Sequence, residues 1–284
     1  MKEILELMHQ QYNSSDFLDS DPLALVHEQI SRAPEDQEIV SLLAALFAYG
    51  RVSSIQSFLR NLLPVLTDAP HGFLLDLAAS KTKLKTRFPY YRFQSSTDVQ
   101  TIVRRMAEMV FESKENPSDL LPLERFFGTP QESTLQRISA FQHSFVEGIP
   151  KSRRTSGLVH WIGQSTGRGA RKRLCLYLRW MVRTGYPDLG LYRSFSPADL
   201  IVPLDVHMAR IGQNLEFTGR KTNDWEMAAQ ISLGLSLVHP EDPLKYDFAL
   251  TRPGILGGCT GRWNSRVCPG CNLRSICIQA RKKT

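Results

Sequence analysis

The sequence predicts an all-α protein, on the strength of three observations. Apolar residues recur at helical spacing along much of the 284-residue chain. Residues that favour helix N-termini, such as Ser, Asn and Asp followed by Pro, stand just before several of these stretches. Alternating apolar and polar residues, which half-buried strands require, are scarce. We therefore expect helices joined by short loops.

The first half of the chain contains two clear helical patterns. Residues Ile39–Tyr49 are apolar on nearly every side, as in a helix buried all round. After Gly50, either Ser53 or Ser54 can cap a second helix, which Pro64 then disturbs. The apolar face of this second helix comprises Ile55, Phe58, Leu59, Leu62 and Leu63.

The second half adds two further helix starts. Asn223, followed three residues later by Glu226, reads as a capping box ahead of the apolar face Met227, Ile231 and Leu235. Asp242 and Pro243 open a short helix that continues through Phe248. Loops are expected where Pro, Gly, Ser, Asn and charged residues cluster, at residues 68–72, 114–119 and 128–132.

Composition excludes some classes of protein. The N-terminus lacks the apolar stretch of a signal peptide, and the longest apolar run, Ile39–Tyr49, is too short to span a bilayer. We expect a soluble cytoplasmic protein, with no membrane partner, whose thiols stay reduced. This expectation disfavours disulfides and favours a metal centre. Cys175 stands apart from the other cysteines and is expected to be a small core residue.

Positive charge is concentrated in two segments that contain no acidic residue. The net charge is +7. The first segment, residues 151–173, and the second, residues 252–284, each carry seven basic residues. They are Lys151, Arg153, Arg154, Arg168, Arg171, Lys172 and Arg173, and then Arg252, Arg262, Arg266, Arg274, Arg281, Lys282 and Lys283. Such segments indicate a surface for nucleic-acid phosphates, although a solvated tail and helix face would look the same.

Four of the five cysteines, Cys259, Cys268, Cys271 and Cys277, lie close to the C-terminus. Zinc modules usually supply two close pairs of ligands, whereas this segment has one close pair separated by Pro269 and Gly270. A chain that wraps one cube-shaped cluster uses irregular spacings of this kind. The spacing favours a [4Fe–4S] cluster, and leaves zinc, or thiols without a metal, as alternatives.

The cysteine order resembles that of the endonuclease III branch of the helix-hairpin-helix DNA glycosylases, with a first interval that is two residues longer. Two further segments resemble the same superfamily: PLDVHMARIGQNL at 203–215 and GRGARKRLCLYLRWMVR at 167–183. The resemblance implies that Asp205 is the catalytic carboxylate and Lys172 the nucleophile. The whole chain looks most like an uncharacterised bacterial branch of this superfamily. The 33-residue interval between Lys172 and Asp205 is closer to that of archaeal 8-oxoguanine DNA glycosylases.

The chemistry of base removal explains why these residue types are needed. Three like charges near Lys172, on Arg168, Arg171 and Arg173, disfavour an ammonium ion and so favour a nucleophilic amine. The alternative is that Lys172 only contacts a phosphate, as Arg171 and Arg173 are expected to do. Asp205 precedes a helical pattern, so it can stabilise positive charge on the sugar or simply cap the helix. His207 is expected to have a structural role.

The resemblance implies a two-lobed helix-hairpin-helix glycosylase fold with a C-terminal four-cysteine iron–sulfur loop. Its expected parts are lobe one at 36–150, the hairpin and catalytic lobe at 151–250, and the cluster loop and basic tail at 251–284, with N-terminal helices at 1–35 packing on the lobes. The expected protein is a monomeric, nucleoid-associated DNA N-glycosylase with AP lyase activity. It acts on damaged double-stranded DNA through a lysine Schiff base, and the long interval weakly favours an oxidised purine.

Two alternatives to this enzyme stay open. The chain lacks the Leu-Pro-Gly-x-Gly turn of the family, which favours a non-catalytic nucleic-acid-binding iron–sulfur protein on the same scaffold. The cysteine centre could also serve as a redox sensor. The cluster loop presents Arg262 and Arg266 as candidate DNA contacts and Trp263 as a stacking or packing residue.

Overall fold

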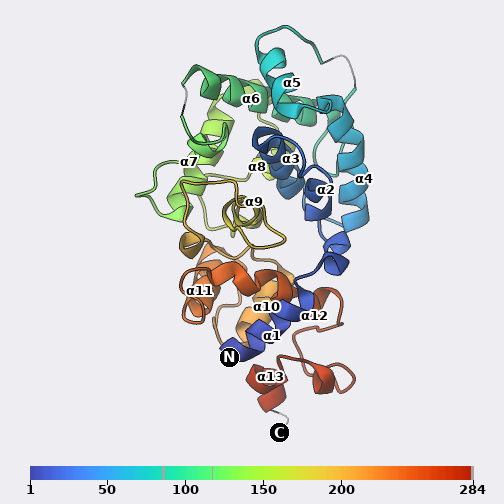
Figure 1. Ribbon diagram of the computed structural model, residues 1–284, viewed down its shortest axis with the longest axis vertical. Helices are drawn as coiled ribbons and strands as arrows, with labels where there is room; N and C mark the ends of the chain where they lie inside the picture. The colour runs from blue at the N-terminus through green and yellow to red at the C-terminus, as the bar shows by residue number, and fades with distance from the viewer. Residues whose placement is uncertain (85–86, 117, 283–284) are drawn as a thin grey trace. The chain divides into compact units, whose positions relative to one another are not determined.

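The described structure is helical throughout. The computed structural model describes residues 1–84, 87–116 and 118–282, apart from the side chains of residues 19 and 20. Within these ranges it contains two isolated β-bridges and no strand, which confirms the predicted all-α class (Figure 1). The α-helices are α1 (Lys2–Tyr12), α2 (Leu23–His27), α3 (Pro34–Leu46), α4 (Val52–Leu62), α5 (Pro70–Ala78), α6 (Ser96–Glu115), α7 (Thr134–Glu147), α8 (Ser156–Ile162), α9 (Lys172–Val182), α10 (Val206–Asn214), α11 (Trp225–Ser236), α12 (Asp247–Ile255) and α13 (Ile278–Arg281).

The chain forms two compact units. The terminal unit comprises Met1–Phe17, Arg168–Gly190 and Ser196–Thr284, and the central unit comprises Leu18–Gly167 and Leu191–Phe195. The segments expected from the glycosylase resemblance, 36–150, 151–250 and 251–284, divide the chain at other positions and stay a prediction. Every predicted catalytic, cysteine and DNA-binding residue belongs to the terminal unit.

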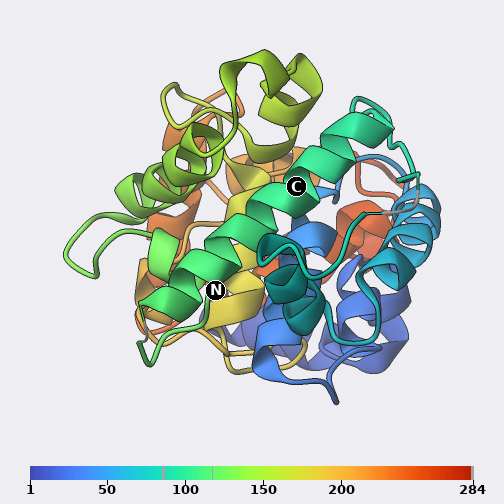
Figure 2. The ribbon, with the colours of Figure 1, turned by 90° about the horizontal axis from the view of Figure 1, so that it is seen from above.

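The core of the central unit is built around α3. Every residue from Asp36 to Leu46 is buried, as the apolar run predicts. The helix begins earlier than expected because Pro34 suits its first turn and the acidic side chains of Glu35 and Asp36 favour a helix N-terminus. The long helix α6 packs against α5 and crosses the view in Figure 2.

Two local expectations for the central unit were wrong. Helix α4 begins at Val52, and its N-cap residue is Arg51, with no capping side chain, so neither Ser53 nor Ser54 caps it. Helix α5 begins at Pro70, inside the loop expected at 68–72, because proline is well suited to the first helical position. As predicted, Pro64 ends the regular α-helix, and a 3-10 helix follows at Leu63–Leu66.

Glu38 holds two loops of the central unit together. Its buried carboxylate accepts hydrogen bonds from the backbone N–H of Leu123 and of Glu124, at 3.1 and 3.0 Å, and from the Tyr192 hydroxyl at 2.9 Å. Burial raises the pKa of Glu38 to about 8, although these three donors favour the ionised form. The Glu124 carboxylate in turn accepts from the N–H groups of Arg193 and Ser194. Loops distant in sequence are thus ordered by two acidic side chains.

The terminal unit is built around α9. Residues Leu174–Val182 of this helix are buried. Helix α10 packs on α11 and α12, and α1 packs on α12. Near α1, the Glu6 carboxylate accepts from Lys245 Nζ and from the Tyr246 hydroxyl, both at 2.7 Å.

The last two predicted helix starts were partly wrong. Asp224, rather than Asn223, caps α11, accepting from the Met227 N–H at 3.0 Å. Its carboxylate also pairs with Arg220 at 2.5 Å, an interaction that an asparagine would not make with equal strength. After Asp242, the chain forms a 3-10 helix at Pro243–Tyr246 and then the longer α12.

Candidate active site and cysteine pocket

The segment before α9 is held in place by the start of α11. The Trp225 N–H donates to the Arg168 carbonyl at 2.9 Å, and Gly169 forms a β-bridge with Asp224. Arg171 then takes a left-handed conformation, with φ of 48°, and serves as the N-cap residue of α9. These contacts position Lys172 as the first residue of the helix.

The three flanking arginines differ in their surroundings. Arg171 donates to the Gly169 carbonyl at 3.1 Å, and its guanidinium lies 5.7 Å from the centre of the Trp225 ring. Burial lowers the pKa of Arg171. Arg168 is exposed and Arg173 is half-buried. Arg171 therefore helps to build the segment, and Arg168 is the most accessible of the three to a phosphate.

Lys172 lies at a position that helix stability does not explain. The N-terminus of a helix carries partial positive charge, which opposes a cation in the first turn. The first turn of α9 nevertheless carries both Lys172 and Arg173 and no acidic residue. Lys172 is half-buried, and no ion pair to its ammonium group occurs among the residues that the structure describes. The N-terminus of a helix together with basic side chains suits an anionic ligand.

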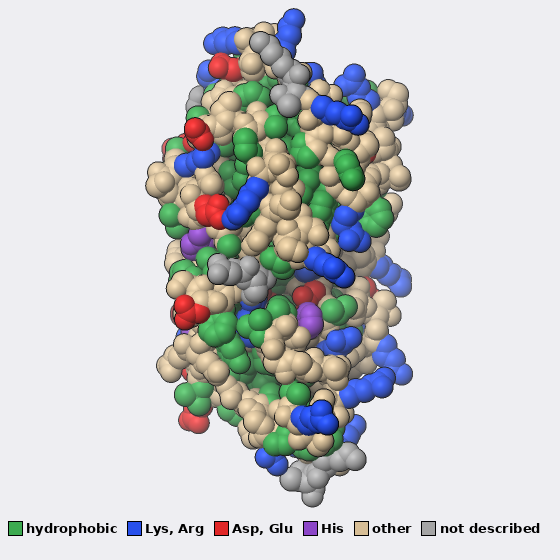
Figure 3. All heavy atoms as spheres, turned by 90° about the vertical axis from the view of Figure 1, so that its right-hand side faces the viewer, with side chains coloured by type: hydrophobic (Ala, Val, Ile, Leu, Met, Phe, Trp, Pro, Cys, Tyr) green, Lys and Arg blue, Asp and Glu red, His purple; other side chains and the backbone are tan. Residues whose placement is uncertain are grey.

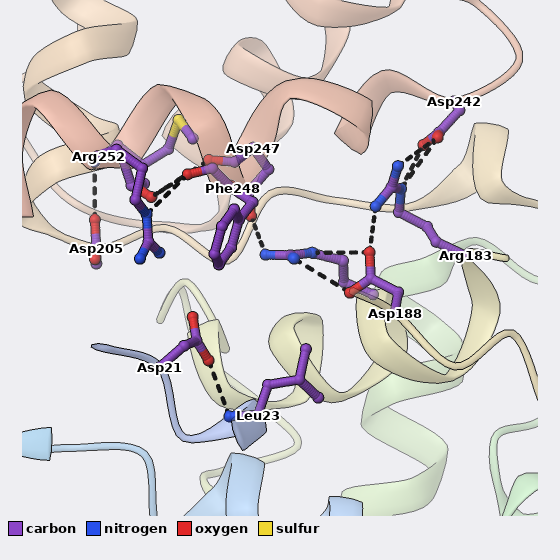
Figure 4. Close-up of polar contacts among 12 residues, drawn as sticks. Asp21, Leu23, Arg183, Asp188, Asp205, Asp242, Asp247, Phe248 and Arg252 are labelled. Carbon is purple, nitrogen blue, oxygen red and sulfur yellow. Dashed lines mark hydrogen bonds and ion pairs between the residues drawn. The ribbon is translucent and has the colours of Figure 1, made fainter. Parts of the chain in front are cut away.

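Asp205 is the N-cap residue of α10, and its carboxylate uses only one oxygen for this purpose. Oδ1 accepts from the N–H of His207 at 2.9 Å and from the N–H of Met208 at 2.8 Å (Figure 4). The side chain is half-buried. The capping role considered from sequence is therefore present, and Oδ2 is left for a second role.

Helix α9 is tied to α12 by a buried network of ion pairs (Figure 4). Arg179 bonds to Asp247 at 2.7 Å and to Asp188 at 3.2 Å. Arg183 pairs with Asp188 and, at 2.8 Å, with Asp242. Burial raises the pKa values of Asp188 and Asp247, against the opposing effect of the arginines. Removing one member of such a network leaves a buried charge without a partner, which is strongly destabilising.

Asp247 links the helix of Lys172 to Asp205. The neighbouring Asp205 carboxylate adds to the rise in the pKa of Asp247 that burial causes. Asp247 also contributes to the raised pKa of Cys175, which burial brings to about 12. Cys175 lies in the core, as predicted, one helical turn after Lys172. Lys172 and Asp205 thus belong to elements that both approach Asp247.

This ion-pair network was not predicted from the sequence. The signal that could have found it is Arg179, a charged residue inside the otherwise apolar stretch LCLYLRWMV. A fully buried arginine requires acidic partners. These partners come from Asp188 and Asp247, which are 9 and 68 residues away, so the sequence does not identify them.

His207 contributes to the packing of α10 against α12. A Cβ atom at Gly254 would lie 2.3 Å from His207 Nδ1, so the glycine permits the close approach. His207 Nδ1 is buried, and no hydrogen-bond partner for it occurs among the described residues. This arrangement agrees with the structural role expected for His207.

The four C-terminal cysteines line one pocket. Cys259, Cys268, Cys271 and Cys277 are free, half-buried thiols around it. Apolar side chains of α10 and its surroundings, including Ile211 and Leu215, form another part of the lining. Burial raises the pKa of Cys271, and the other three thiols add to the rise, because thiolates close together repel one another. The donor set suits a metal centre that offsets this repulsion.

The spacing of these thiols bears on the kind of centre. In the described ranges, no three His, Cys, Asp or Glu side chains meet closely enough to hold a single metal ion. Four thiolates on one zinc ion would each lie about 2.3 Å from the metal. A cuboidal cluster is larger than one ion and takes its four thiolates at wider separation. Four half-buried thiols around one pocket are a donor set that suits either a zinc ion or an iron–sulfur cluster.

Hydrogen bonds order the loop between the first two cysteines. Asn214 of α10 donates to the Gly261 carbonyl at 3.2 Å and accepts from Gln279 at 3.2 Å. The Asn264 N–H donates to the Cys268 sulfur at 3.3 Å. The loop exposes Arg262 and Arg266, whereas Trp263 is half-buried.

Several basic residues of the two acid-free segments bond to other groups of the protein and are therefore less available to a ligand. Arg252 is buried and donates to the Phe248 carbonyl, Arg281 pairs with Glu216, and Arg154 pairs with Glu147. Lys283 lies outside the described residues. Around the C-terminal end, Figure 3 still shows more Lys and Arg side chains than acidic ones. The basic surface is thus smaller than the two sequence segments suggest.

No helix in the described ranges has the length and apolar character that a membrane span requires. No curated protein and no solved structure matches the chain. One family model does, "Protein of unknown function (DUF2400)", over residues 21–256. The matched range includes Lys172 and Asp205 and ends before Cys259. Because the match spans well over half of its length, the chain belongs to the DUF2400 family.

Proposed function

We propose that the protein is an iron–sulfur DNA glycosylase with AP lyase activity, on a helix-hairpin-helix glycosylase scaffold. Two observations support the proposal: Lys172 is the first residue of α9, and the Asp205 carboxylate that caps α10 has one oxygen outside its helix cap. The substrate is damaged double-stranded DNA, and the oxidised purines are the preferred lesions. The protein acts as a monomer associated with the nucleoid.

The chemistry needs an amine and a carboxylate on one extruded nucleotide. The Lys172 amine attacks C1′ of the sugar, and the electron pair of the bond from C1′ to the base leaves with the base. Asp205 Oδ2 stabilises the positive charge that develops on the sugar and accepts a proton from the attacking amine. Opening of the sugar ring then gives a Schiff base between Lys172 and C1′. In the elimination, a base removes a proton from C2′ of this adduct, a double bond forms between C2′ and C3′, and the bond from C3′ to the phosphate oxygen breaks, so that the phosphate leaves with its electron pair.

The ion-pair network supports this arrangement by fixing α9 relative to α12. Arg179 and Arg183 leave α9 little freedom to rotate or slide, because each contacts a buried aspartate. The reactive lysine is thus carried on a rigid element, which favours precise positioning. Asp205 is fixed by two backbone N–H groups of its own helix.

The cysteine pocket is the proposed site of a [4Fe–4S] cluster held by Cys259, Cys268, Cys271 and Cys277. When bound, the cluster supplies rigidity to the loop that carries Arg262 and Arg266. These exposed arginines, together with Arg168 and Arg173, would contact phosphates beside the lesion. Arg171 belongs to the same segment but is partly committed to Trp225.

Borohydride trapping tests the proposed activity. Duplexes that contain an abasic site or an oxidised purine are incubated with the protein, with and without borohydride. A reduced covalent adduct is expected with the natural chain and not with Lys172→Ala. Lys172→Arg is a matched variant that retains the positive charge and so retains phosphate contacts.

Two outcomes would overturn the proposal. Equal trapping by Lys172→Ala would remove Lys172 as the nucleophile. Absence of any adduct and of any base release, with DNA binding retained, would favour the non-catalytic binder, for which the missing Leu-Pro-Gly-x-Gly turn is the supporting observation.

A further inference from the structure

The central unit carries an exposed group of aromatic and basic side chains, far in sequence from the candidate active site. We call it the aromatic–arginine surface and define it as Tyr49, Arg51, Tyr90, Arg92, Phe93 and His160. Tyr90 is 76% exposed and Phe93 is 58% exposed. Large aromatic side chains that are exposed and close together in the sequence are candidates for a binding surface.

Three rings of this surface, those of Tyr49, Phe93 and His160, lie against one another. The Phe93 ring stacks against the Tyr49 ring with centroids 6.3 Å apart, and its centroid lies 4.6 Å from that of His160. The Arg92 guanidinium lies 5.9 Å from the Tyr49 centroid and 5.6 Å from the Phe93 centroid. A planar cation and several rings are therefore gathered at one place.

A tight turn presents Arg92 and Phe93 to solvent. Tyr91 and Gln94 exchange two backbone hydrogen bonds of 2.9 Å, which leaves Arg92 and Phe93 at the tip of the turn. Arg92 has φ of 51°, a left-handed conformation that costs free energy for a residue other than glycine. The surrounding structure holds the turn in this conformation.

Buried side chains fix the base of the turn. The Tyr91 hydroxyl donates to the Tyr49 carbonyl at 2.6 Å, and Gln94 Nε2 donates to the Gly157 carbonyl at 2.6 Å. The Tyr49 hydroxyl donates to the Gln94 side-chain oxygen. The Tyr91 ring packs in the core, 4.8 Å from the Phe58 ring. The exposed tip is thus rigidly supported from three separate segments.

These three segments contain no acidic residue. Residues 39–67 supply Tyr49 and Arg51, residues 77–97 supply the turn, and residues 148–167 supply His160, and none of the three contains Asp or Glu. The segment before the turn adds the exposed Lys81, Lys83 and Arg87. The next residue after the turn segment, Asp98, is buried and bonded to Ser95. Exposed rings together with exposed cationic side chains complement a ligand that has flat faces and anionic links between them.

We propose that the aromatic–arginine surface binds single-stranded DNA, with bases stacked on Phe93 and Tyr90 and phosphates paired with Arg51 and Arg92. A base within a duplex has both faces covered by its neighbours, so stacking on these rings requires unpaired nucleotides. The exposed side chains are rings and cationic donors, without the carboxylate or amide acceptors that would read a ribose 2′-hydroxyl. The surface therefore favours DNA. This site is separate from Lys172 and Asp205 and would position unpaired DNA on the central unit.

Fluorescence anisotropy of the full chain with a labelled oligothymidylate tests the proposal. The oligothymidylate is expected to bind more tightly than a duplex or an oligouridylate of equal length. Phe93→Ala is expected to weaken its binding at least about fivefold, and the Arg92→Ala, Phe93→Ala double variant more strongly. Phe93→Trp keeps a stacking ring and should bind within about twofold of the natural chain.

Matched variants separate stacking at this surface from a general effect of positive charge. Arg104→Ala removes an exposed arginine from α6 of the same unit and controls for the general loss of charge. Borohydride trapping of Phe93→Ala on a duplex with an abasic site is measured separately from oligothymidylate binding, so failure of the proposed enzymatic function and failure of this surface are distinguishable. An effect of Phe93→Ala no larger than that of Arg104→Ala overturns the proposal. Tighter binding of the duplex or the oligouridylate than of the oligothymidylate also overturns it.

Discussion

At the scale of single residues, Asp205 shows how one side chain can serve stability and chemistry together. Its Oδ1 accepts both capping hydrogen bonds, so the other oxygen can face a substrate without cost to α10. The two roles are separable by substitution, because asparagine caps helices about as well as aspartate but carries no charge.

We predict that Asp205→Asn folds with nearly unchanged stability and releases base at least about 100-fold more slowly. Asp205→Ala should lose about 1 kcal/mol of unfolding free energy as well, because the cap is removed. Thermal melting and single-turnover base release measure the two effects. Normal base release by the asparagine variant would show that the residue is a cap alone.

The residues around Lys172 show that sequence neighbours can have different roles. Arg171 and Arg173 look equivalent in the sequence, yet Arg171 adopts a left-handed conformation and lies over Trp225. The sequence could not reveal this difference, because Trp225 is more than fifty residues away. Lys172, which the sequence analysis assigned only through a resemblance, is the first residue of α9.

At the scale of elements, Glu38 couples α3 to two loops of the central unit. Its pKa of about 8 in the folded protein compares with an ordinary value of 4.5. The folded state therefore holds a proton that the unfolded chain releases between these two pH values. By linkage, the free energy of unfolding falls as the pH rises from about 4.5 to about 8.

We predict that Glu38→Gln flattens this dependence. The glutamine variant should be less stable than the natural chain at pH 5, because its amide nitrogen replaces Oε2, which accepts from the Leu123 N–H. Between pH 5 and 8 its melting temperature should fall less steeply. Glu28→Gln, at an exposed ion pair with Arg60, is the matched control and should leave the slope unchanged. Parallel slopes for the natural chain and Glu38→Gln would contradict the prediction.

At the scale of the whole molecule, the C-terminal segment depends on elements that precede it in the sequence. The cysteine pocket is completed by Ile211 and Leu215, and Asn214 bonds to both Gly261 and Gln279. The family match ends at residue 256, before this segment. The cysteine-containing segment is thus integrated into the terminal unit through α10, the helix that Asp205 caps.

We predict that Cys271→Ser reduces bound iron and the broad absorbance at about 400 nm to well below half of the natural values, of about four irons per chain. Cysteine at this position is required because thiolate is the ligand that iron–sulfur clusters use. Cys175→Ala removes the buried thiol outside the pocket and should retain the iron. Anaerobic purification followed by metal analysis makes the comparison. Stoichiometric zinc in the natural chain would contradict the cluster assignment.

The sequence by itself determined the helical class, the buried helix around Ile39–Leu46 and the cap at Asp205. Each of these features depends on residues that are close together in the chain, through helical periodicity or capping. At Asn223 and Asp224, either residue could cap the following helix. Asp224 is the cap in the structure, and its carboxylate also pairs with Arg220.

Only the tertiary structure decided which charged residues interact with one another and which are exposed at the surface. Arg179 forms an ion pair with Asp247, and Glu38 accepts a hydrogen bond from Tyr192. Arg252, which the sequence suggested as part of a basic surface, is buried in the core. The convergence of four cysteines on one pocket and the supported turn at Arg92 and Phe93 are likewise tertiary features. The physical reason is that burial changes the energetics of a charge or a polar group far more than its neighbours in sequence do, and burial is set by packing between distant segments.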